Sequence, residues 1–259
     1  ELNNLTLTLG NESSDLKINN PLILDQINEK LIAGAADLEL NELLSISNGE
    51  LSSSGGEIRL NNGLDISGGE VEILNSSLLI GSELGSQVSL IQSGGSLLAE
   101  TSSLQLIQNL ILQSIEGFSF QSLDLNSREL SLASETSSLS LKEKLIFDLI
   151  SEKINTGSAD LRLEGGIQMS AGEISSSGGT IALSLTSENY FQNDAVMILE
   201  NTALEPVDPD SGSAIMTLDG EPNISLNGGI ISFIDLQRSE GTIGTVSTRD
   251  GVNCSESCN

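Results

Sequence analysis

Apolar and polar residues alternate in short runs along most of the chain, most clearly between residues 49 and 74. Within each run the apolar residues take every second position, which is typical of a β-strand with one buried face. The apolar positions of this stretch are Leu51, Ile58, Leu60, Leu64, Ile66, Val71 and Ile73. Between the runs lie segments 53–56, 61–63 and 67–69, which are rich in glycine, serine and asparagine. Because glycine and asparagine accept a positive φ at little cost, these segments predict tight corners.

Equivalent apolar positions recur at a constant spacing along this stretch. The pairs are Leu44 and Leu64, Leu51 and Val71, and Ile58 and Leu78. A repeat of about 20 residues matches one coil of a three-sided parallel β-solenoid, in which short strands bury their apolar faces by stacking coil on coil. We therefore predict an all-β fold, a parallel β-solenoid (β-helix) with coils of about 20 residues.

The chain also contains a long internal duplication. Residues 1–60 align without a gap with residues 124–183, a shift of 123 residues, and nearly half of the aligned positions are identical. The identities include a Ser-Ser-Ser-Gly-Gly block and the pair Asp37 and Asp160. The shift is close to six coils of about 20 residues, so a second copy preserves the stacking of a solenoid.

The duplication and the strand rhythm divide the chain into four predicted segments. They are a first solenoid copy at 1–123, a second copy at 124–185, inserted loops at 186–213 around a short strand at 196–199, and terminal β coils with a C-terminal cap at 214–259. We place the loops where the only tyrosine and two of the four prolines interrupt the rhythm.

Segment 21–33 and its copy 144–156 fit two kinds of structure. Ile23, Ile27 and Leu31 have the spacing of one helix face. Leu22, Ile23 and Leu24 fit a buried strand equally well. Because the flanking segments read as strands, we expect strands here as well.

Composition narrows the possible functions. The chain has 37 acidic and 10 basic residues, no histidine and a net charge of −27. Nucleic-acid binding needs clustered lysine and arginine, so no nucleic-acid partner is expected, and an anionic membrane surface is disfavoured for the same reason. Without histidine, a Ser–His–Asp or Cys–His catalytic site is impossible. No apolar run is long enough for a transmembrane helix, so no transmembrane segment is predicted.

The two cysteines, Cys254 and Cys258, lie close together near the C-terminus. A pair of this kind without histidine is a poor zinc site and suggests a local disulfide formed in an oxidising compartment. Two free thiols are the alternative. The chain begins with Glu1 rather than methionine, which suggests a mature, signal-cleaved or excised protein.

The best candidates for metal ligands are Asp208, Asp210 and Asp219, which flank a glycine-containing turn. Carboxylates in this arrangement can bind Ca²⁺ through oxygen, and an ordinary acidic turn is the alternative. No other cofactor is expected. Tyr190 and Phe191 form the one aromatic pair in a predicted loop; they either contact a partner or pack over the side of the solenoid.

Catalysis has little support in this sequence. Two carboxylates suffice for glycoside hydrolysis, but sugar clefts usually contain aromatic platforms, and the chain has one tyrosine and no tryptophan. Glu50, Glu57 and Glu70 lie near predicted corners, where solvated strand edges explain them. We therefore expect that the protein is not an enzyme.

Three stretches, 49–73, 172–183 and 227–231, resemble the short Gly-Gly-x-Ile-x-Leu coils of the filamentous haemagglutinin-like exoproteins of bacterial two-partner secretion. The resemblance covers about two thirds of the chain and implies a right-handed β-helix, secretion, and adhesion or surface attachment. The family's secretion-domain signature is absent, and members are often much larger than this chain.

Together these features predict a secreted, extracellular or cell-surface protein with a structural or adhesive role. Open strand edges at the ends of a solenoid pair with other chains, and head-to-tail contacts build open filaments. The first expectation is a subunit that polymerises head to tail, with itself as partner. The alternatives are a monomeric adhesin module that binds a cell-surface receptor or glycan and, less favoured, a polysaccharide-active β-helix enzyme.

Overall fold

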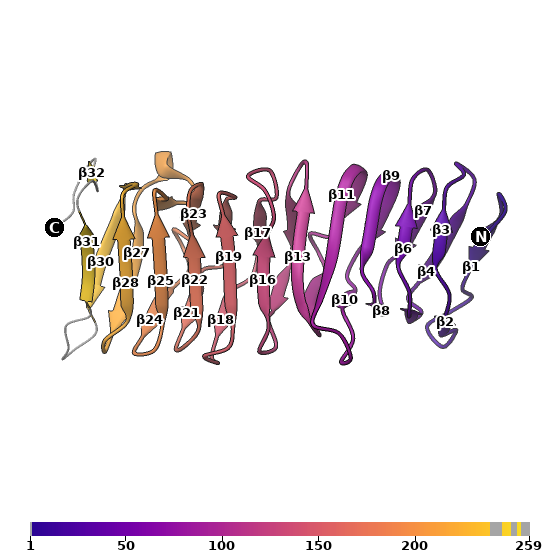
Figure 1. Cartoon of the computed structure of the whole chain (residues 1–259), viewed down its shortest axis with the longest axis horizontal. Coiled ribbons are helices and arrows are strands. Elements are labelled where there is room, and N and C mark those ends of the chain that lie inside the picture. Colours follow the sequence, from indigo (N-terminus) through magenta and orange to yellow (C-terminus); the bar gives the residue numbers. More distant parts are fainter. Residues whose placement is uncertain (1, 239–244, 250–252, 255–259) are drawn as a thin grey trace. The chain divides into compact units, whose positions relative to one another are not determined.

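The computed structural model describes residues 2–238, 245–249 and 253–254 (Figure 1). It confirms the predicted fold class, because the protein is all-β and its parallel strands stack as a β-solenoid. Its helical structure in the described ranges is one short 3₁₀ helix, Pro209–Ser211. None of the described residues belongs to a helix long and apolar enough to cross a membrane. The chain divides into two compact units, residues 1–126 and 127–259, which are described separately below.

In unit 1, most strands pair in parallel with the strand one coil further along the chain. One sheet has the order β1-β4-β7-β9-β11-β13, with β6 joining β3 to β9, and a second has the order β15-β12-β10-β8-β5-β2. The strands are β1 (Thr6–Thr8), β2 (Leu16–Ile18), β3 (Leu22–Leu24), β4 (Lys30–Gly34), β5 (Leu38–Leu40), β6 (Leu44–Ile46), β7 (Glu50–Ser53), β8 (Glu57–Leu60), β9 (Leu64–Ile73), β10 (Ser77–Ile80), β11 (Gln87–Leu98), β12 (Ser103–Leu106), β13 (Asn109–Ser114), β14 (Phe118–Phe120) and β15 (Ser122–Asp124).

In unit 2, successive strands join three sheets in turn, so each coil has three sides. The sheet orders are β16-β19-β22-β25-β28-β31, β17-β20-β23-β26-β29-β32 and β18-β21-β24-β27-β30. The strands are β16 (Glu129–Leu132), β17 (Leu139–Leu141), β18 (Leu145–Phe147), β19 (Lys153–Gly157), β20 (Leu161–Leu163), β21 (Ile167–Met169), β22 (Glu173–Ser176), β23 (Thr180–Leu183), β24 (Asn189–Gln192), β25 (Val196–Glu200), β26 (Ala203–Pro206), β27 (Ala214–Asp219), β28 (Asn223–Asn227), β29 (Ile230–Ile231), β30 (Ile234–Arg238), β31 (Thr245–Arg249) and β32 (Asn253–Cys254).

The strand register confirms the stacked apolar pairs predicted from the sequence. The paired positions are Leu44 with Leu64, Leu51 with Val71, and Ile58 with Leu78. All six side chains are fully buried. Each core residue therefore packs mainly on the equivalent residue of the next coil, which is why small aliphatic side chains suffice for this interior.

The internal duplication is also visible in the register. Thr6 pairs with Lys30, and the equivalent positions of the second copy, Glu129 and Lys153, pair in the same way. The next coil repeats this agreement, because Lys30 pairs with Glu50 and Lys153 pairs with Glu173. The two copies therefore fold into matching coils.

Some coils are longer than predicted. Leu78 pairs with Leu104 and Val196 pairs with Asn223, so each of these coils contains several residues more than the coil between Leu44 and Leu64. The extra residues lie in the corners, at 81–86 between β10 and β11 and at 207–213 between β26 and β27. A corner can lengthen without disturbing the stacked strands on either side of it.

Two local predictions need correction. Segment 186–213, predicted as loops around one short strand, contains the three strands β24, β25 and β26. Segment 67–69, predicted as a corner, lies inside the long strand β9, where the ladder with β11 continues with shifts of register. In both cases pairing with the neighbouring coil overrides the local preference of glycine and polar residues for turns.

The strands expected in the ambiguous segment 21–33 and its copy are present. The first segment contains β3 and most of β4, and the copy contains β18 and most of β19. Ile27, which fits the helical spacing, is instead 78% exposed in the turn between β3 and β4.

Candidate functional surfaces

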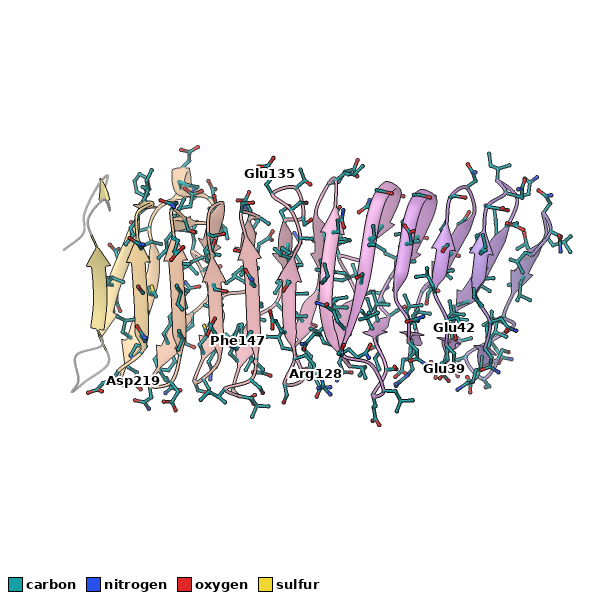
Figure 2. The ribbon with its side chains drawn as sticks, in the orientation of Figure 1. Glu39, Glu42, Arg128, Glu135, Phe147 and Asp219 are labelled. Atoms are coloured by element: carbon teal, nitrogen blue, oxygen red, sulfur yellow. The ribbon has the colours of Figure 1, made fainter. Side chains whose placement is uncertain are left out.

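The predicted Ca²⁺ ligands do not form one cluster. Asp208 precedes the 3₁₀ helix and accepts a hydrogen bond from the Ser211 hydroxyl, and Asp210 lies within that helix. Asp219 ends β27 and lies at the margin of unit 2 in Figure 2. Across the described ranges, no group of three or more acidic residues or cysteines is arranged to hold a metal ion.

The two aromatic residues predicted to lie in a loop are instead neighbours on strand β24. Phe191 points into the core and is fully buried, so it is unavailable as a partner contact. Tyr190 points outward and is half-buried, and its hydroxyl donates a hydrogen bond of 2.6 Å to Asp219 Oδ2. The strict alternation of a strand separates the two rings onto opposite faces.

The predicted disulfide between Cys254 and Cys258 lies outside the described residues. Only the backbone of Cys254 is described, in β32, where it pairs with Ile231. The disulfide stays a prediction.

Outward-facing lysines and glutamates form ion pairs between neighbouring coils. Lys17 Nζ lies 2.7 Å from Glu39 Oε1, Lys142 Nζ lies 3.0 Å from Glu164 Oε1, and Lys30 pairs with Glu50. The hydrogen bond and charge of Lys17 hold the pKa of Glu39 below its ordinary value. Glu39 lies at the margin of unit 1 in Figure 2, and such exposed pairs contribute little stability.

A buried carboxylate that sequence reasoning missed organises the turn between β3 and β4. Glu29 is only 1% exposed, and its Oε2 accepts hydrogen bonds from the backbone N–H groups of Asp25 (2.8 Å) and Gln26 (3.1 Å). Glu152 occupies the equivalent turn in unit 2 and accepts the equivalent bonds from Asp148 and Leu149. The signal in the sequence is the identity of the two glutamates between the copies.

The pKa of Glu29 reflects two opposing effects. Burial disfavours the charged carboxylate and raises the pKa, but hydrogen bonds from the backbone outweigh burial and hold the pKa below its ordinary value of 4.5. The donors are the N–H groups of Gln26, Asp25, Asn4 and Asn3. Glu29 therefore acts as an ionised anchor that ties the first residues of the chain to the β3–β4 turn.

Glu29→Gln is expected to make the free energy of unfolding less dependent on pH in the acidic range. A carboxyl group whose pKa is lowered by folding stabilises the folded state above its unfolded pKa, and this stabilisation is lost as the pH falls through the folded pKa. The variant lacks this term, so its urea midpoint should be lower than wild type at pH 7 and should approach wild type below pH 4.5. Urea unfolding at a series of pH values measures the convergence.

The control for this experiment is Glu83→Gln, a change at an exposed loop residue with no hydrogen-bond partner in the described part of the chain. Its urea midpoint should follow wild type at every pH. A Glu29→Gln profile that stays parallel to wild type down to acid pH would contradict the anchoring role.

In the N-terminal coil, leucine side chains that continue the apolar core remain partly exposed to solvent. Strand β1 is at the end of its sheet, and its residue Leu7 is in register with Leu31 of β4. Leu31 is fully buried, whereas Leu7 is 36% exposed and the preceding Leu5 is 66% exposed. The core ladder of unit 1 therefore reaches β1 with apolar side chains still accessible to solvent.

The described residues thus form stacked coils with an exposed end strand, β1, and a β-solenoid of this kind is compatible with a structural or adhesive role. Comparisons of the chain with protein-family models, with curated proteins and with solved structures found no match.

Proposed function

We propose that this protein is an extracellular structural subunit that stacks end to end with further copies of itself to form a filament. The observation that carries the proposal is the exposure of Leu5 and Leu7 at end strand β1. An end strand also has one row of backbone N–H and C=O groups directed away from its sheet, and these groups are a template for another strand.

Stacking of a further coil on β1 would remove the exposed leucines from water. Leu31, Leu51 and Val71, which follow Leu7 along the same core ladder, are all fully buried. Full burial of a leucine side chain is worth about 1.5–3 kcal/mol. A contact between two different ends of a solenoid is heterologous, so its repetition produces an open filament rather than a closed dimer.

Polar side chains of the N-terminal coil could fix the register in which a coil of a second copy stacks on it. Asn61 donates to Asn41 (2.7 Å) and Asn41 donates to Asn19 (2.6 Å), so the ladder of side-chain amides runs towards the N-terminal coil. The Asn19 side-chain NH₂ group, first in this ladder, donates to no residue in the described ranges. Lys17 likewise heads a row of charged residues and can attract a carboxylate.

The proposal predicts that Leu7→Asp abolishes self-association. The wild-type chain should form polymers whose length increases with concentration, because each contact buries the leucines of β1. A charge at position 7 would have to lose its hydration at the contact, which weakens association. If the loss is about 1.4 kcal/mol or more, the variant should remain monomeric even at about ten times the concentration at which the wild-type chain polymerises. Sedimentation velocity and negative-stain electron microscopy measure the size distributions.

The matched control is Ile198→Asp, because Ile198 on β25 is exposed to the same extent as Leu7, at 36%, but faces outward from the side of unit 2. This variant should polymerise like wild type. A wild-type chain that is monomeric at every concentration, or a Leu7→Asp chain that polymerises normally, would refute end-to-end stacking.

A monomeric adhesive module is the second candidate, and a specific observation favours it. Ile27 and Ile150 occupy equivalent turns in the two copies, and they are 78% and 77% exposed. The buried Glu29 and Glu152 hold these two turns in one conformation. Each turn therefore presents an exposed isoleucine that can bind a partner with little loss of conformational entropy, because the turn is already ordered. Binding of monomers to cells that is lost in the Ile27→Ser, Ile150→Ser double variant would support this function.

A further inference from the structure

The outward row of unit 2 that contains the only tyrosine is free of charge in a strongly acidic protein. The row crosses the sheet β18-β21-β24-β27-β30, with one residue from each strand, and consecutive members are in register. Its members are Ile146, Gln168, Tyr190, Thr217 and Gln237. In β18, β21, β24 and β27 the side chains on both sides of the member are buried, so the row forms an outer face of the solenoid.

Tyr190 is held in place at the centre of this row. Its hydroxyl donates to Asp219 Oδ2 at 2.6 Å, and Gln192 Nε2 donates to the same oxygen at 3.3 Å. Gln192 Nε2 also lies 3.4 Å from the Tyr190 hydroxyl. The phenol ring is therefore fixed by two side chains of the adjacent outward row, and a ligand would meet it already ordered.

Gln168 and Thr217, which flank Tyr190 in the row, have side-chain polar groups available for hydrogen bonds with a ligand. Within the described residues, the Gln168 amide and the Thr217 hydroxyl have no hydrogen-bond partner. A side-chain amide and a hydroxyl both donate and accept hydrogen bonds. Adjacent strands lie about 4.8 Å apart, so a ligand lying along the row would meet an amide, an aromatic ring, a hydroxyl and a second amide at regular intervals.

We propose that the row from Ile146 to Gln237 is a binding face for a neutral oligosaccharide that lies across the strands. Sugar hydroxyls match groups that both donate and accept, and the apolar C–H face of a sugar ring packs on an aromatic ring such as that of Tyr190. The net charge of −27 repels acidic polymers, so a neutral ligand is favoured over an anionic one. This inference concerns a side face and stands independently of assembly at the ends.

Tyr190 itself supplies the readout for a test. The chain has one tyrosine and no tryptophan, so tyrosine fluorescence, excited at a wavelength that phenylalanine does not absorb, reports on this row alone. The full-length protein would be titrated with cellohexaose, maltohexaose and a mannohexaose, and with polygalacturonate as the anionic comparison. We expect saturable changes in tyrosine emission with at least one neutral hexasaccharide, little dependence on salt, and no change with polygalacturonate.

Gln168→Ala should weaken the binding at least about fivefold, since a net hydrogen bond contributes on the order of 1 kcal/mol. The matched control is Gln105→Ala, which removes an outward glutamine from β12 of unit 1 and should bind like wild type. Tyr190→Ala, measured by calorimetry, should abolish binding, and circular dichroism would verify that each variant is folded.

Three results would overturn the proposal. They are a lack of response to all three neutral hexasaccharides at millimolar concentration, stronger binding of polygalacturonate than of any neutral sugar, or equal effects of Gln168→Ala and Gln105→Ala.

Discussion

Leu161→Asp should destabilise unit 2 by about 4 kcal/mol or more, because it places an unpaired charge in the core and removes a packed leucine. Leu161 on β20 is fully buried between Leu139 of β17 and Ile181 of β23, which are 1% and 0% exposed. The stacked backbones leave no route for a carboxylate to reach water without breaking the ladder. Urea unfolding followed by circular dichroism measures the loss.

The control for this change is Gln168→Asp. Gln168 is on the adjacent strand of the same coil, β21, and faces outward without a hydrogen-bond partner in the described ranges. The introduced charge is the same but remains in water, so the cost should be within about 0.5 kcal/mol. Equal urea midpoints for Leu161→Asp and wild type would mean that position 161 does not face the core, which would contradict the register.

The fold was predictable because contacts and periodicity coincide in a solenoid. Leu44 packs on Leu64 and Leu51 packs on Val71, so the residues that touch are the residues that recur with the period of the sequence. In most folds, contacts join segments with no sequence resemblance, and a single chain does not reveal them. Here the pattern of apolar residues specifies both the strand faces and their partners.

Errors arose where stacking overrides local preference. The glycine pair at 68–69 predicts a corner, yet it lies within β9, which pairs with both β6 and β7. Similarly, the polar segment around Tyr190 reads as a loop until its pairing with Gln168 and Thr217 is seen. The glycine and polar residues of these segments do not by themselves indicate that a neighbouring coil will pair with them as strands.

The candidate sites were harder to predict than the fold for a related reason. Acidic residues at corners are usually exposed to solvent at the edge of a strand. That expectation does not distinguish Glu29, which is buried within the turn whose backbone it binds. Tyr190 was recognised as unusual because it is the only tyrosine, but its partner Asp219 lies on the strand of the following coil. The pairing depends on the length of the corner at 207–213, which no periodicity predicts.

Gly56→Ala should be strongly destabilising, at about 3 kcal/mol or more. Gly56 has a φ of +74°, and a Cβ atom there would lie 2.7 Å from the carbonyl oxygen of Ala36 and 2.8 Å from that of Ala35. Both oxygens belong to the backbone of the preceding coil, so they can move only if the stacking of the coils changes. The equivalent Gly179 has the same geometry, which gives a physical reason for the identity of the Ser-Ser-Ser-Gly-Gly block in the two copies.

Gly34→Ala separates the steric cost of the added Cβ atom from the cost of a left-handed backbone conformation. Gly34 has a φ of +60°, but a Cβ atom there would have no neighbour within 4 Å. Its substitution should therefore cost only about 1–2 kcal/mol, which is the cost of a left-handed conformation. Urea unfolding of both variants measures the difference, which is the cost of the steric contact between coils. Equal losses would show that the backbone conformation alone requires glycine, and that the coils can separate enough at this corner to admit a methyl group.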